Sequence, residues 1–363
     1  TVSAMIVGGV TMTIAFVVLV IGSMGWRALS DRKGPRAVVL TGTVLLIAGL
    51  LLASFASSLV GFQLWFGAVV GVSAAAIFAP LMACVTGWFD THRSLAVSLV
   101  SAGMGMAPLT MSPLVAWLVQ AHDWRTTLQI VAVVVAAVML PAAMLIRRPP
   151  ALAAAQAAGA ATEAGMSVGQ ALRSAPFIIL VLTSFLTCAT HSGPIFHTVS
   201  YAVTCGIPLM AAVSIYSLEG LAGMGGRLVF GLLGDRFGAA RTLVLALLAQ
   251  AIVVLGYVYA RDLKSFYTVA SLFGFTYAGV MPLFAVIARD NFPLRMMGTV
   301  IGGTAMASSV GMALGPVLGG LIYDSFSTYR WLFIGAFAMG MGACLCALMF
   351  TRLPRRALAA MPA

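Results

Sequence analysis

Two charged side chains interrupt an apolar helix that the sequence predicts over residues 209–231. Glu219 lies near the middle of this helix, and Arg227 follows eight residues later. Charged groups at membrane depth are costly and commonly mark a site for a substrate or a proton. Arg227 presents a planar fork that suits a carboxylate, and a carboxyl group such as Glu219 can enter an apolar region once it is protonated. The two residues therefore point to binding of an organic anion at Arg227 and proton coupling at Glu219.

Both residues also have plainer structural explanations. Arg227 could extend its side chain to the membrane surface, and Glu219 could be a protonated hydrogen-bonding group within the fold. On an ideal helix the two lie about 80° apart around the axis and about 12 Å apart along it. We therefore do not expect them to pair directly.

The preceding predicted helix, 176–201, carries His191, His197 and Tyr201 in its second half. We assign His191 to proton coupling and His197 and Tyr201 to substrate binding, and the alternative for each histidine is a packing role. The histidines lie about 120° off one helix face, and no cysteine or acid stands at ligand spacing. The sequence thus predicts no metal and no cofactor. Tyr277, on a predicted helix 265–288, is a further substrate-binding candidate.

Composition sets the environment of these helices. The 363 residues are 61% hydrophobic and 8% charged, with mean hydropathy +1.07, whereas a soluble domain carries about 25% charged residues. The bilayer is therefore the expected solvent. Charge-free runs, divided at "ASSLVG" and "TCGIP", predict eleven transmembrane helices. Strands are excluded because lipid-exposed barrel strands would alternate polar and apolar residues.

Lysine and arginine residues give the orientation. Threading eleven spans places fifteen of the twenty on one side, which identifies that side as cytoplasmic and the C-terminus as cytoplasmic. The net charge of +11 is thus a topology signal, and its scatter over short loops argues against nucleic-acid binding. We expect a multi-pass protein of the cell inner (plasma) membrane that acts as a monomer.

A short motif occurs twice after a predicted helix. "RALSDRKGPR" contains Asp31 and Arg32, and "GLLGDRFGAAR" contains Asp235 and Arg236, 204 residues later. Two helices precede the second copy after the linker, but only one precedes the first. We therefore expect two six-helix halves with a first helix missing before Thr1, and the alternative is a native eleven-helix protein.

The halves predict the domain boundaries. The N-terminal half covers 1–146, an Ala/Gly-rich cytoplasmic linker covers 147–175, the C-terminal half covers 176–351, and a basic cytoplasmic tail covers 352–363. Neither the linker nor the tail is large enough for an enzyme domain.

The doubled motif resembles that of the major facilitator superfamily of transporters. The resemblance implies an all-α membrane fold of two six-helix halves and a gating role at the cytoplasmic side for Asp31, Arg32, Asp235 and Arg236. Arg27 departs from the pattern because the family has glycine there.

A second stretch, "GWFDTHRSLAVSLVSAGMGMAP" (87–108), is similar to the signature of bacterial monocarboxylate transporter-like proteins, and its Arg93 joins the gating candidates. That resemblance implies an arginine anchor for the substrate at Arg227, with an aspartate one turn earlier. Here Gly223 holds that position, which puts the family's proton-linked Asp-Arg pair in doubt.

These observations favour a secondary transporter of small organic anions, the monocarboxylates, working by alternating access with proton symport. A facilitator-type exporter of drugs or other small molecules is the alternative. A membrane enzyme or sensor would need an acid-base or metal cluster, which nine scattered acidic residues do not supply. The sequence also lacks a Gly-Lys-Ser/Thr phosphate loop, so ATP is not expected to drive it.

Overall fold

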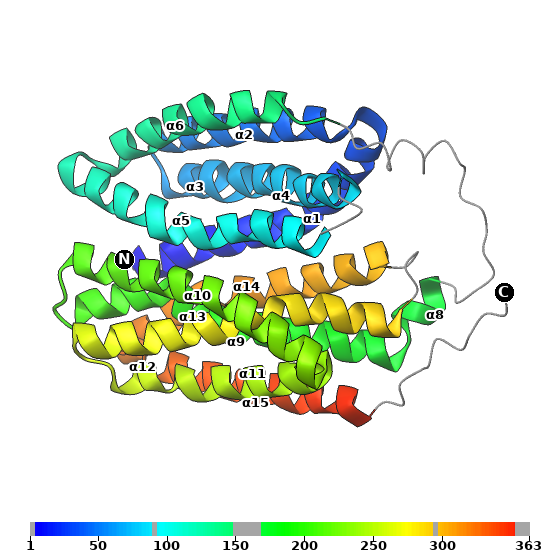
Figure 1. Ribbon diagram of the computed structural model, residues 1–363. Coiled ribbons are helices and arrows are strands. Elements are labelled where there is room, and N and C mark those ends of the chain that lie inside the picture. The colour runs from blue at the N-terminus through cyan, green and yellow to red at the C-terminus, as the bar shows by residue number, and fades with distance from the viewer. Residues whose placement is uncertain (1–3, 89–92, 148–167, 293–296, 353–363) are drawn as a thin grey trace. The chain divides into compact units, whose positions relative to one another are not determined.

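The computed structural model describes residues 4–88, 93–147, 168–292 and 297–352, and the regular elements within these ranges are helices (Figure 1). The chain divides into two compact units, Thr1–Ala164 and Gly165–Ala363. Most of the predicted linker, at 148–167, and most of the tail, at 353–363, lie outside the described residues.

The first unit contains five long helical segments. In chain order, its elements are α1 (Ala4–Lys33), α2 (Pro35–Ser54), α3 (Leu59–Phe62), the π-helical η1 (Gln63–Val69), α4 (Val70–Trp88), α5 (Arg93–Ala121) and α6 (Trp124–Met144). The segments α3, η1 and α4 follow one another without a gap from Leu59 to Trp88. The break predicted at "ASSLVG" is confirmed between α2 and α3.

The second unit contains the candidate site. Its elements are α8 (Val168–Leu172), α9 (Ala175–Thr204), α10 (Leu209–Phe237), α11 (Ala239–Val254), α12 (Gly256–Tyr259), α13 (Leu263–Asn291), α14 (Met297–Phe326) and α15 (Arg330–Arg352). The break predicted at "TCGIP" is confirmed, with Gly206 at φ 86° and Pro208 before the first turn of α10. The predicted helix 209–231 is longer than expected, because α10 continues through Asp235 and Arg236 to Phe237.

Eight helical segments in the described residues are long and apolar enough to cross a membrane, and two shorter apolar helices lie at Val10–Leu19 and Leu109–Ala121. In a bilayer such helices satisfy their backbone hydrogen bonds internally. The chain is therefore a multi-pass, all-α membrane protein.

The two copies of the Asp-Arg-x-Gly motif have the same backbone geometry. Gly34 ends α1 with φ 87° and Gly238 ends α10 with φ 89°, and the next helix begins one residue later in each case. A side chain is disfavoured at such φ values, which is why glycine stands at this point of both turns.

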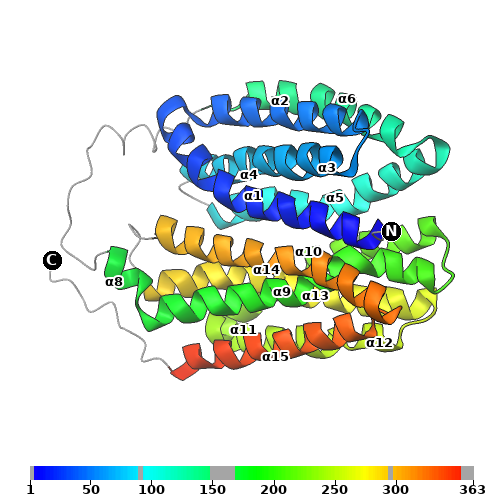
Figure 2. The same ribbon diagram turned by 180° about the vertical axis from the view of Figure 1, so that it is seen from behind.

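Glycines allow close approach of helices in the second unit. On α10, a Cβ at Gly223 would lie 3.0 Å from the Ala278 Cβ of α13, and a Cβ at Gly226 would meet the backbone of Phe275. Glycines on α14, among them Gly315 and Gly319, face α9 in the same way, and these two helices run side by side in Figure 2. Small residues permit this packing because it brings backbones into van der Waals contact. The depth and rotation of α9, α10 and α13 are thereby fixed.

Candidate functional site

The two predicted proton-coupling residues lie in contact inside the second unit. His191 Nε2 on α9 lies 3.4 Å from Glu219 Oε1 on α10, and both side chains are buried. The sequence predicted a role for each but did not pair them, because they stand 28 residues apart on different helices. A buried carboxyl beside an imidazole can share or exchange one proton, which is a common arrangement in proton relays.

His191 and Glu219 each have a second polar side-chain atom that takes no part in this contact. His191 Nδ1 and Glu219 Oε2 are buried and have no hydrogen-bond partner among the described residues. An unsatisfied buried polar atom costs about 1–3 kcal/mol, and the large majority of buried polar side-chain atoms have a partner. The pair therefore keeps one atom on each side available for a proton, a water molecule or a substrate.

Helix α13 frames this pair with aromatic rings. The His191 ring stacks on Tyr277, with ring centroids 3.3 Å apart, and on Phe273, with centroids 5.5 Å apart. Between these two rings in sequence stands Gly274, where a Cβ would clash with the backbone carbonyl oxygen of Glu219 and lie 2.7 Å from its Cγ. The absence of a side chain at Gly274 therefore lets α13 approach the α10 backbone closely at Glu219.

Arg227 lies on the same helix as Glu219 and near the same frame. It is half-buried, and its guanidinium is within electrostatic range of the Tyr277 hydroxyl. Tyr277 also approaches Cys188, with 4.0 Å between the hydroxyl oxygen and Sγ. Tyr277 thus stacks on His191 and also lies near the cation of Arg227, a proximity that sequence spacing alone does not reveal.

His197 and Tyr201 belong to a different cluster nearer the end of α9. His197 Nε2 lies 3.3 Å from the carbonyl oxygen of Pro316 on α14, and Gly319 leaves space for its ring. The Tyr201 hydroxyl donates to the carbonyl of Ala260 at 3.3 Å and accepts from the Arg261 guanidinium. These contacts give both residues structural partners, and their predicted substrate-binding role stays a prediction.

The gating candidates lie at helix ends. Asp235 and Arg236 are exposed in the last turn of α10, and the Arg236 guanidinium lies 5.5 Å from the centroid of the Phe237 ring. Asp31 and Arg32 fall in the last turn of α1, and Arg93 begins α5. The side chains of these three lie outside what the structure describes, so the latch remains a prediction.

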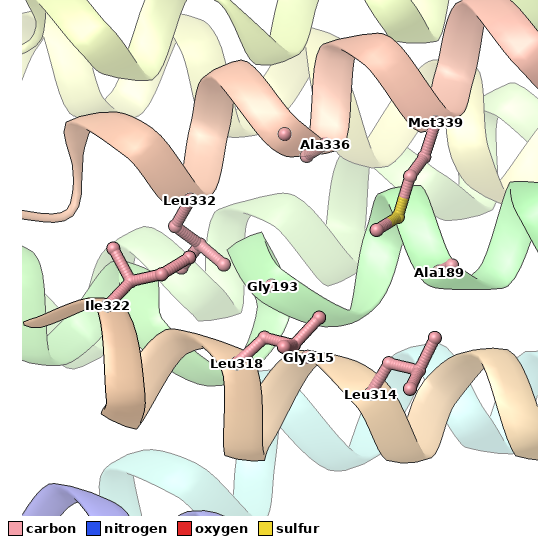
Figure 3. A pocket seen from close by; sticks show the side chains of 10 residues that line it. Ala189, Gly193, Leu314, Gly315, Leu318, Ile322, Leu332, Ala336 and Met339 are labelled. Atoms are coloured by element: carbon pink, nitrogen blue, oxygen red, sulfur yellow. The ribbon is translucent and has the colours of Figure 1, made fainter.

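One pocket in the second unit is too apolar to receive an anion. Its volume is about 40 Å³, and it lies between α9, α14 and α15 (Figure 3). Gly193, Leu332, Gly335 and Met339 are among the residues that line it. Within the described residues, no group of three His, Cys, Asp or Glu side chains could hold a metal ion.

A chain of membrane-spanning helices with a buried ionisable pair has the character of a transporter, and sequence comparison identifies which kind. The profile of the Major Facilitator Superfamily matches residues 3–311 and, in a second match, 264–360. The chain belongs to the major facilitator superfamily of transporters. It is therefore a transporter and not an enzyme.

Comparison with individual proteins shows which members of the superfamily the chain is similar to. Monocarboxylate transporter 13 of Rattus norvegicus is 30% identical over 322 residues, which cover 88% of this chain and 74% of the relative. The Bos taurus protein of the same name is 29% identical over the same shares of both chains. An MFS-type transporter of Gibberella moniliformis is 26% identical over 87% of this chain and 75% of its own length. The chain is thus similar to monocarboxylate transporters along most of its length.

Proposed function

We propose that this protein carries small organic anions, the monocarboxylates, across the membrane together with protons. The observation that supports this most directly is the buried His191–Glu219 pair, which shares the aromatic frame of Tyr277 with the cation of Arg227. A proton site and an anion anchor placed on one short helix segment are what coupled movement of an acid requires. Similarity to monocarboxylate transporters supports the same substrate class.

In this proposal Arg227 binds the carboxylate of the substrate through its planar fork. Tyr277, which stacks on His191 and lies near Arg227, orients the substrate. Glu219 takes up the transported proton with His191 as its partner. The proton makes occupancy of Arg227 by an anion electrically favourable, because it removes the nearby negative charge of Glu219.

The position of Glu219 follows from packing on α10. The family pattern puts an aspartate where Gly223 stands here, one turn before Arg227. A Cβ at Gly223 would lie 3.0 Å from Ala278 Cβ and 3.3 Å from the carbonyl oxygen of Gly274. An aspartate would force α10 and α13 apart at this point. We infer that the proton site moved one turn away, to Glu219, where Gly274 provides space.

We further propose that eleven helical segments span the membrane, with α1, α5 and α10 added to the eight apolar ones. The halves 1–146 and 176–351 would rock about the bound substrate to give alternating access. Asp31, Arg32, Arg93, Asp235 and Arg236 would latch the cytoplasmic side. The protein would act as a monomer in the inner (plasma) membrane, with a cytoplasmic C-terminus.

The second candidate is export of drugs or other small molecules by the same fold. The similar protein of Gibberella moniliformis is named only as an MFS-type transporter, a name that specifies no carboxylate substrate. An exporter of neutral compounds has no need of an anion anchor, so the two candidates differ in whether short monocarboxylates compete for transport.

Uptake by proteoliposomes tests the proposal. We expect an imposed inward pH gradient to drive accumulation of a labelled short monocarboxylate, and unlabelled monocarboxylates to compete with it. Collapse of the gradient with a protonophore should remove accumulation. Protein-free vesicles control for passive diffusion of the protonated acid. Failure of every short monocarboxylate to compete, with transport of a neutral compound instead, would overturn the substrate assignment in favour of the exporter.

A further inference from the structure

Seven buried side-chain polar atoms of the second unit have no hydrogen-bond partner among the described residues. Three belong to Thr183 and Gln250, and the other four are His191 Nδ1, Glu219 Oε2, Thr198 Oγ1 and the Tyr257 hydroxyl oxygen. Of these four, the first two belong to the proposed proton site, but the other two have no role so far. Thr198 is 1% exposed and Tyr257 is fully buried. Leaving such atoms unsatisfied is costly, so their presence together calls for an explanation.

Thr198 differs from two other buried threonines of α9, and Thr183 shares this difference. The buried hydroxyls of Thr187 and Thr190, on the same helix, donate to backbone carbonyls four residues earlier, at 2.7 and 2.8 Å. Thr198 makes no such bond within its helix. Its hydroxyl lies within reach of the Tyr257 hydroxyl instead, and Tyr257 lies within electrostatic range of Glu219. Tyr257 therefore lies near both Thr198 and Glu219.

Contacts between aromatic rings link the His191–Glu219 pair to Tyr257 and onward to Tyr201. Phe273, which stacks on His191, also meets Tyr257 edge to face at 5.9 Å between centroids. Tyr257 meets Phe266 at 6.4 Å, and Phe266 meets Tyr201 at 5.3 Å. An unbroken series of packed rings thus runs from the proton site to Tyr201.

The series reaches solvent at Arg261. The guanidinium of Arg261 donates to the Tyr201 hydroxyl and to the Ala260 carbonyl, the latter at 2.7 Å, and Arg261 is exposed. Thr198 lies one turn before Tyr201 on α9, on the same helix face. The hydroxyls of Tyr201, Thr198 and Tyr257 are therefore arranged between an exposed end and the buried carboxyl.

We propose that Thr198 and Tyr257 form a proton path between the Arg261–Tyr201 end of the unit and the His191–Glu219 pair, with bridging water where the hydroxyls are not in contact. This inference rests on the proposed proton coupling. In each transfer an O–H bond forms on Glu219 Oε2 while the Tyr257 O–H bond breaks, and Tyr257 takes a replacement proton from the Thr198 side. Each hydroxyl gives one proton and receives one, so neither retains a charge.

Other titratable groups also face Glu219. His191 contacts it from α9, Tyr216 lies within its electrostatic range on α10, and Tyr277 does so from α13. Tyr277 also interacts electrostatically with Arg227. Among these phenols, Tyr257 is the one whose hydroxyl also lies within reach of Thr198.

The test separates proton entry from substrate binding. Two assays are run on reconstituted full-length chain: net uptake of a labelled monocarboxylate driven by a pH gradient, and exchange of labelled for unlabelled substrate at equal pH on both sides. Exchange needs no net proton movement. For Tyr257→Phe and Thr198→Val we expect net uptake to fall by about tenfold or more while exchange stays near the wild-type rate. Thr198→Ser keeps the hydroxyl and should restore net uptake.

Matched controls are Thr190→Val, whose hydroxyl is satisfied within α9, and Tyr329→Phe, another fully buried tyrosine in the second unit. Both should retain net uptake. Normal net uptake in Tyr257→Phe and Thr198→Val would overturn the path, and so would an equal loss of uptake and exchange. If the wild type shows exchange but no response to the pH gradient, the proposed proton coupling itself fails, and the path fails with it.

Discussion

Gly274 on α13 lies against Glu219 on α10: a Cβ at Gly274 would clash with the Glu219 backbone carbonyl oxygen and lie 2.7 Å from Glu219 Cγ. The missing side chain lets the backbones of the two helices approach closely at the residue that contacts His191. The position of the buried acid therefore depends on a glycine of the neighbouring helix.

Replacing Gly274 with alanine should damage both packing and transport. The added methyl overpacks the interface, which typically costs about 1–3 kcal/mol of stability, and it displaces the α10 backbone at Glu219, which should disturb the contact with His191. Gly225→Ala on α10 is the control, because its Cβ would meet the nearest atom at 3.9 Å, an ordinary contact. Thermal unfolding in detergent and pH-driven uptake would be measured for both. Equal behaviour of the two variants would contradict the shape argument.

Glu219→Gln should uncouple transport from the pH gradient. The amide has nearly the same volume as the carboxyl but does not take up a proton at physiological pH. We expect gradient-driven accumulation to be lost, while substrate exchange at equal pH continues. Uptake is compared at several external pH values with Glu219→Asp as the conservative partner. A Glu219→Gln protein that still accumulates substrate along the gradient would remove Glu219 from proton coupling.

Arg227 is tested by separating its charge from its shape. Arg227→Lys keeps the charge and loses the bidentate fork, so the KM for a monocarboxylate should rise by about tenfold. Arg227→Ala should abolish anion uptake. Rates are normalised to folded protein. If lysine supports wild-type kinetics, Arg227 extends to the membrane surface rather than binding substrate.

Asp123 should make the first unit sensitive to acid. It caps α6 by accepting a hydrogen bond from the Thr126 backbone N–H at 2.6 Å, and this bond lowers the pKa of the Asp123 carboxyl. Because the pKa is lower in the folded state, the contribution to stability is present above about pH 4, the unfolded value, and is lost as the pH falls through the folded value.

The measurement is the unfolding temperature of the detergent-solubilised protein from pH 7 downward. Asp123→Asn retains a capping oxygen, so it should match the wild type near neutral pH and lose less on acidification. Asp123→Ala should be less stable at neutral pH. An acid profile of Asp123→Asn identical to that of the wild type would show that the cap does not carry the pH dependence.

Two glycines that line the apolar pocket should respond oppositely to alanine. Gly335 has no atom within 4 Å of the position of a Cβ, so Gly335→Ala enters open space and should stabilise the protein by about 0.5–1 kcal/mol through helix propensity. A Cβ at Gly193 would lie 2.9 Å from Leu332 Cδ1, so Gly193→Ala should destabilise. Unfolding temperatures of both variants check the pocket, and a stabilised Gly193→Ala would contradict its geometry.

The sequence by itself determined the helices and their environment. Charge-free runs long enough to cross a bilayer leave the helix as the available structure, because lipid provides no partner for backbone polar groups. The breaks before Leu59 and Leu209 were predictable from Gly, Pro and polar residues. The doubled motif likewise identified two equivalent turns, and Gly34 and Gly238 share the same left-handed backbone conformation.

Only the tertiary structure decided which polar residues meet. Spacing along one helix placed His191 with His197 and Tyr201, and Glu219 with Arg227, but contacts across helices depend on the depth and rotation of each helix. Those are set by the close packing of α10 on α13 and of α9 on α14 at their glycines. This packing joins His191 to Glu219 and Tyr277, and it places His197 against Pro316 instead. The sequence pattern shows which residues share a face of one helix. It does not show how far two packed helices are shifted and rotated relative to each other, and the site depends on that arrangement.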